Sequence, residues 1–75
     1  MRLRLDAGKI ERFRVTEGLL KRELASRANI HPNQITRVLA REAVGVRVAR
    51  SLASAMGVPV REITAELVEP AATTG

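Results

Sequence analysis

Polar and basic side chains that can bind nucleic-acid bases and phosphates gather in the middle of the chain. Over residues 32–41 these side chains are Asn33, Gln34, Thr36, Arg37 and Arg41. An Asn side chain can form two hydrogen bonds with adenine, and an Arg side chain can form two with guanine. Lys21 and Arg22 precede this stretch and carry the positive charge that binds phosphate. This chemistry is typical of proteins that recognise a polyanion. It requires helices or strands that present these side chains on one face of the protein.

The chain offers no set of residues for catalysis or for binding a metal. It has no cysteine, and His31 is its single histidine. No paired carboxylates, Ser-His-Asp set or glycine-rich phosphate loop stands out in the sequence. We therefore expect a protein that is not an enzyme and has no metal, cofactor or small-molecule ligand. His31 precedes Pro32, so we expect it to cap a helix or to lie beside a phosphate.

The positive charge is concentrated in the first two-thirds of the chain. Residues 1–50 hold twelve of the thirteen Lys and Arg residues against five acids, a net charge of +7. Residues 51–75 hold one Arg against three Glu, a net charge of −2. This distribution favours a polyanionic partner on one side of the molecule, although a solvated, Arg-rich surface has the same composition.

Length and composition indicate one small globular domain. The 75 residues are 45% hydrophobic and 28% charged, which is typical of a folded chain of single-domain size. No apolar run approaches the roughly 20 residues that span a membrane. The start, MRLRLD, lacks the apolar segment of a secretory signal. We therefore expect a cytoplasmic protein with no membrane partner.

Apolar residues recur at helical spacing along most of the chain, which predicts an all-α fold. The five expected helices cover residues 7–17, 21–28, 32–40, 46–56 and 60–67. Asp6 is expected to cap the first helix and Gly57 to end the fourth. Asn29, which tolerates the left-handed conformation, is expected to turn the chain between the second and third helices.

The remaining segments are expected to lie outside the helices. Residues 41–45 are predicted to form a linker and residues 69–75 a flexible tail. Residues 1–6 are predicted to form an N-terminal arm, although MRLRL alternates in polarity and could also be a short strand. The domain proper is expected to cover residues 7–68.

Two motifs at fixed spacing make the chain resemble the Cro/repressor-type helix-turn-helix family, which has the lambda-repressor-like fold. The first is Leu24-Ala25, followed by the turn residue Asn29, the apolar Ile30 and a buried Ile35. The second is the sequence LASAMGV at residues 52–58, which matches the family's Leu-Ala-x-x-Leu-Gly-Val. The match runs without gaps from residue 10 to residue 63. The resemblance implies a compact five-helix bundle whose second and third helices form the helix-turn-helix.

The chain also departs from the family pattern. Leu20 stands where Thr or Ser usually caps the second helix, and Lys21 stands where Gln is common. Many members pair an Arg late in the first helix with an acid at the end of the third. Arg14 is present, but Leu39 occupies the position of the acid, and Glu42 is the nearest substitute.

The resemblance implies roles for individual residues on double-stranded DNA. In the family the third helix enters the major groove, which puts Pro32, Asn33 and Arg37 against the bases. Residues expected at phosphates or at the flanks of the contact are Lys21, Arg22, Gln34, Thr36, Arg41 and Arg47. Each of these side chains could instead be plain solvated surface.

The resemblance also implies a homodimer on a palindromic operator, because one short helix reads only a few base pairs. Members of the family usually pair through their C-terminal helices. The interface candidates are Val60, Ile63, Leu67 and Val68, unless these residues simply close the core of a monomer.

The expected function is that of a sequence-specific transcriptional regulator that acts as a repressor. A phage or mobile-element regulator is favoured, because the tail available for capturing a toxin is short. The antitoxin of a toxin–antitoxin pair remains an alternative. So does an architectural or protein-interaction module, whose DNA binding would fall with salt equally for all sequences.

Overall fold

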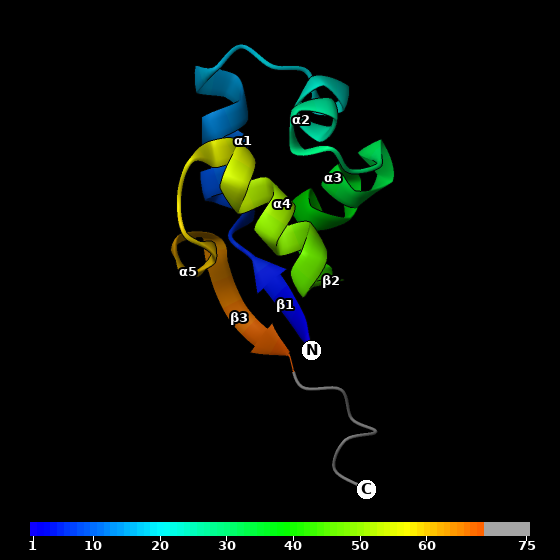
Figure 1. Ribbon diagram of the computed structural model, residues 1–75, viewed down its shortest axis with the longest axis vertical. Coiled ribbons are helices and arrows are strands. Elements are labelled where there is room, and N and C mark those ends of the chain that lie inside the picture. Colours follow the sequence, from blue (N-terminus) through cyan, green and yellow to red (C-terminus); the bar gives the residue numbers. More distant parts are fainter. Residues whose placement is uncertain (69–75) are drawn as a thin grey trace, which may run out of the picture.

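Residues 1–68 form five helices and a three-stranded antiparallel sheet, whose arrangement is shown in Figure 1. The structure, a computed structural model, describes residues 1–68, so the predicted tail at 69–75 lies outside the described residues. In chain order the elements are β1 (Arg2–Leu5), α1 (Ala7–Thr16), α2 (Lys21–Ala28), α3 (Pro32–Leu39), β2 (Ala43–Gly45), α4 (Val46–Met56), α5 (Val60–Ile63) and β3 (Thr64–Val68). The predicted all-α fold class is therefore wrong, and the fold is mixed α/β.

The first residues of the chain form the central strand of the sheet, whose order is β2-β1-β3. Leu3 and Leu5 of β1 are buried in the core and alternate with two arginines. Leu3 lies opposite Val44 of β2 and Leu67 of β3. A buried strand needs hydrogen-bond partners along both edges. The segment predicted as a linker supplies one partner strand, and the end of the predicted fifth helix supplies the other.

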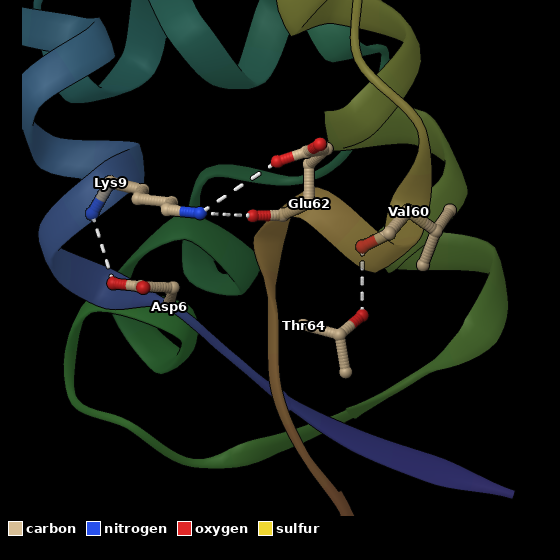
Figure 2. A network of polar contacts seen from close by, with 5 residues as sticks. All are labelled: Asp6, Lys9, Val60, Glu62 and Thr64. Atoms are coloured by element: carbon tan, nitrogen blue, oxygen red, sulfur yellow. Dashed lines mark hydrogen bonds and ion pairs between the residues drawn. The ribbon is translucent and has the colours of Figure 1, made fainter.

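The predicted helix over residues 60–67 is wrong beyond Ile63. Thr64 is extended, with φ −92° and ψ 121°, and its hydroxyl donates a hydrogen bond to the Val60 carbonyl at 2.8 Å (Figure 2). The spacing of Ile63 and Leu67 fits a helix, but a helix over these residues would leave one edge of β1 unpaired. Pairing with β1 therefore overrides the local helical pattern.

Polar contacts tie the start of α1 to α5. Asp6 caps α1 as predicted, because its Oδ1 accepts from the Lys9 amide at 3.1 Å. The Lys9 ammonium donates to the Glu62 carbonyl at 2.9 Å and lies 3.9 Å from Glu62 Oε2 (Figure 2). The Asp6 amide also donates to the Ile63 carbonyl at 2.7 Å. These contacts fix the point at which the chain leaves α5 and enters β3.

The first four helices lie within one residue of their predicted bounds. Gly57 follows α4 with φ +73°, the left-handed conformation expected at a helix C-terminus. The core contains the two leucines of β1 and Val44 of β2. It also contains ten buried side chains from the five helices, namely Ile10, Leu24, Ala25, Ala28, Ile35, Val38, Ala49, Leu52, Ala53 and Ile63. None of the helices described is long and apolar enough to cross a membrane.

Candidate nucleic-acid interface

The turn between α2 and α3 has a backbone that only a few residue types accept. Asn29 ends α2 in the left-handed conformation, with φ 59° and ψ 44°. Its amide donates to the Ser26 carbonyl at 3.0 Å, and the Ile30 amide donates to the Ala25 carbonyl at 2.9 Å. Asn adopts this conformation more easily than other non-glycine residues. The predicted turn at Asn29 is confirmed, and it sets the angle at which α3 leaves α2.

The start of α3 is capped by a histidine. His31 Nδ1 accepts from the Asn33 amide at 3.0 Å, and Pro32 occupies the first helical position. Proline fits there because its missing N–H has no partner in the first turn. The expected capping role of His31 is therefore confirmed. These contacts stabilise the end of α3 that carries Pro32 and Asn33.

α3 separates an apolar face from a polar one. Ile35 and Val38 are completely buried. Asn33, Thr36 and Arg37 are exposed, and their spacing of three and four residues puts them on one side of the helix. Of the other predicted contacts, Pro32 is exposed and Gln34 is half-buried. The helix can therefore present hydrogen-bonding side chains outward while its buried side is held by the core.

The N-terminus of α2 carries the predicted phosphate contacts Lys21 and Arg22, both exposed. Leu20 precedes them, and its side chain has no oxygen that could cap the helix. The Glu23 carboxylate instead accepts from the Leu20 amide at 2.7 Å. This carboxylate neutralises part of the positive charge of the first turn. Attraction of an anion to this end of α2 would therefore come mainly from the side chains of Lys21 and Arg22 and less from the helix dipole.

Two different hollows hold the remaining predicted phosphate contacts. Arg41, with φ 65°, is exposed and lines the same hollow as Lys21, between α1 and the end of α3. Arg47 lies in the first turn of α4, whose N-cap Gly45 supplies no side-chain hydrogen bond. It lines a separate groove with Arg27 and Arg50.

Arg27 and Arg50 of this groove were not among the site residues predicted from the sequence. The signal for Arg50 was its spacing of three residues from Arg47, on the helix face opposite Ala49 and Leu52. Arg27 could not have been found in this way, because it reaches the groove from another helix. Its position depends on how α2 packs against α4.

Arg14 is held by residues near it in sequence rather than by Glu42. Its Nε donates to Glu11 Oε1 at 2.8 Å, and a second bond from the guanidinium to Oε2 makes the pair bidentate. Its Nη1 donates to the Leu19 carbonyl at 2.8 Å. The hydrogen bond from Arg14 lowers the pKa of Glu11, and the positive charges of Arg14 and Lys21 lower it further. Arg14 thus fixes the loop between α1 and α2, which positions the start of α2.

The four dimer-interface candidates do not form one surface. Ile63 is 1% exposed and belongs to the core, so it is not available to a partner. Val60 packs against that core and is half-buried. Leu67 is 59% exposed on β3, and Val68 follows it half-buried at the end of the strand. The exposed apolar surface in this part of the protein is therefore on the sheet rather than on a helix.

No three His, Cys, Asp or Glu side chains within residues 1–68 gather as ligands for a metal ion. No family model matches the chain, and neither does any curated protein or solved structure.

Proposed function

We propose that this protein is a sequence-specific regulator that binds double-stranded DNA, with α3 in the major groove. The observation that carries the proposal is the outer face of α3, where Asn33, Thr36 and Arg37 are exposed while Ile35 and Val38 anchor the helix in the core. Recognition helices have this organisation, because side chains read base edges only when the helix backbone is held in place. Such a regulator would act with DNA in the cytoplasm, as a repressor that occupies a promoter.

Specific roles follow for the residues around α3. Arg37 is the strongest candidate for reading guanine and Asn33 for reading adenine, each with two hydrogen bonds. Lys21, Arg22 and Arg41 would contact phosphates, which position the protein without reading sequence. Pro32 has no backbone donor and would contribute contact with a thymine methyl group.

We propose further that the protein binds its operator as a homodimer that pairs through β3. Within residues 1–68 this strand has no neighbour on its outer edge, and Leu67 is exposed on it. An unpaired strand edge with an exposed apolar side chain is a surface that a second copy can cover by strand pairing. This arrangement replaces the helix-mediated pairing expected from the family resemblance.

Selection of binding sites from random duplex DNA tests the proposed function. We expect an enriched palindrome whose two half-sites lie about one helical turn apart. Binding without any enriched sequence, with equal salt dependence for all duplexes, would instead identify a module that does not read sequence. The spacing of the half-sites reports the dimer independently of the sequence that is read.

A further inference from the structure

A groove of about 580 Å³ lies between the C-terminal half of α2 and the outer face of α4. Arg27 of α2 lines one side, and Arg47 and Arg50 of α4 line the other. The hydroxyl-bearing residues Ser51 and Ser54 also line it. Guanidinium and hydroxyl groups are typical ligands of phosphate oxygens in protein–DNA contacts.

Among residues 1–68, few acidic side chains pair with the positive charge of this groove. Arg27 Nη1 lies 3.7 Å from Glu17 Oε1, and both side chains are about half exposed, so this ion pair is weak. Neither Arg47 nor Arg50 forms an ion pair with any of the residues described. Three cationic groups around one hollow repel one another and raise the local concentration of anions. The groove is therefore suited to a phosphate-bearing ligand.

The length of α2 relates this groove to the proposed DNA contact. Lys21 begins the helix and Ala28, which lines the groove, ends it. At 1.5 Å per residue these two positions are about 10 Å apart along the helix. The major groove of B-DNA is about 12 Å wide. A helix that crosses the mouth of the major groove would thus bring its first turn near one DNA strand and its last turn near the other.

We infer that the arginine groove of α2 and α4 binds the sugar–phosphate backbone of one DNA strand while Lys21 and Arg22 bind that of the other. The inference rests on the proposed DNA-binding function and adds a second contact to it. The duplex is then held from both sides of the major groove, with α3 between the two backbones. These contacts do not read sequence, so they contribute equally to all sites that α3 accepts.

Strand-specific neutralisation of phosphates tests this arrangement on the selected operator. Methylphosphonate linkages replace the charged phosphates flanking the half-site, first on one strand and then on the other. Affinity is measured for the wild type, Lys21→Gln, Arg27→Gln and Arg50→Gln, with Arg61→Gln on α5 as a matched control far from the helix-turn-helix. Circular dichroism monitors the fold of each variant.

We expect Arg27→Gln and Arg50→Gln each to reduce the slope of log affinity against log salt by about 1. Both variants should become less sensitive than the wild type to neutralisation of one strand and keep the wild-type sensitivity to neutralisation of the other, because two arginines remain in the groove of each variant. Lys21→Gln should show the reverse strand preference, and Arg61→Gln should behave as the wild type. All four variants should keep the wild-type base preference.

Three results would overturn the inference. The salt slope and strand sensitivity of Arg27→Gln and Arg50→Gln could match the wild type. Inorganic phosphate could shift the NMR resonances of the groove while the two variants bind DNA normally, which would identify a site for a free anion. Arg50→Gln could change the monomer–dimer equilibrium with an unchanged salt slope, which would identify a protein interface. In each case the proposed function still stands if the groove variants keep the wild-type base preference while Arg37→Ala reduces it.

Discussion

Leu3 and Leu67 lie opposite each other on β1 and β3, yet Leu3 is 4% exposed and Leu67 is 59% exposed. Opposite residues on paired antiparallel strands project to the same face of the sheet. The helices therefore cover this face over β1 and leave it open over β3. An apolar surface continuous with the core thus reaches the edge of the sheet.

We expect Leu67→Ser to weaken dimerisation by about tenfold or more, because each dimer would lose two buried leucine contacts across a two-fold axis. The stability of the monomer should change little, since Leu67 is already exposed. Sedimentation equilibrium would measure the dimer dissociation constant. The matched variant Leu3→Ala should instead destabilise the fold by about 2–5 kcal/mol, because it opens a cavity in the core. An unchanged dimer in Leu67→Ser would exclude pairing through this surface.

Arg37→Ala should lower the preference for the selected operator over a scrambled duplex by roughly 5- to 150-fold, because the hydrogen bonds of one Arg to guanine provide about 1–3 kcal/mol of discrimination. Lys21→Ala should weaken binding to both duplexes by the same factor, since a phosphate contact is the same on every sequence. Fluorescence anisotropy at fixed salt measures both affinities. If Arg37→Ala kept the preference, α3 would not read the base at that position.

Substitutions at Asn29 should separate the conformation of the turn from its chemistry. Asn29→Ala should lower the free energy of unfolding by about 1–2 kcal/mol. Alanine has a Cβ atom that is strained in the left-handed region, and it lacks the polar side chain with which Asn can form a local hydrogen bond. Asn29→Gly should be close to neutral, since glycine adopts this conformation freely. Urea denaturation measures both. Equal destabilisation by the two variants would show that the Asn side chain itself is needed.

The pair between Glu11 and Arg14 should make part of the stability depend on pH. The pKa of Glu11 is lowered in the folded protein, first by the hydrogen bond from Arg14. Its contribution is therefore complete above the pKa of the unfolded chain, about 4.3, and is lost as the pH falls through the lower folded value. We expect the difference in stability between the wild type and Arg14→Gln to be larger at pH 7 than at pH 3.

NMR titration of the Glu11 carboxyl group gives the direct measurement for this pair. Its pKa should rise toward the ordinary value in Arg14→Gln and rise less in Lys21→Gln, because Lys21 contributes only the weakest of the interactions that lower it. A stability difference that is independent of pH would mean that the bond from Arg14 to the Leu19 carbonyl accounts for the effect.

The helices were predictable because their signals are local. Asp6 as N-cap, Asn29 and Gly57 as left-handed C-terminal residues and the apolar spacing between them all act within one or two turns. The sheet was not predictable in the same way. MRLRL has the alternation of a strand, but its partners lie about 40 and 60 residues away in sequence, and each is too short to give a clear pattern of its own.

The candidate site also has one part that could be predicted from local sequence and one part that could not. The polar face of α3 follows from the spacing of Asn33, Thr36 and Arg37 along a single helix. The arginine groove instead requires Arg27 to meet Arg47 and Arg50 from another helix, which is a property of packing. Sequence spacing thus identifies sites built on one element, and the structure is needed for sites built between two.

The position of β1 has a consequence for how the chain folds during synthesis. Arg4 and Glu66, which are 62 positions apart, form a 2.7 Å ion pair between β1 and β3. While it is being made, the nascent chain can form α1 to α4 from local contacts, but β1 must wait for β3 with one edge open. Synthesis that stops before residue 64 would release a chain in which β1, the central strand of the complete sheet, lacks one of its two partner strands. Such a product is prone to aggregation and proteolysis. The fold is therefore complete only once β3 has been made and has paired with β1.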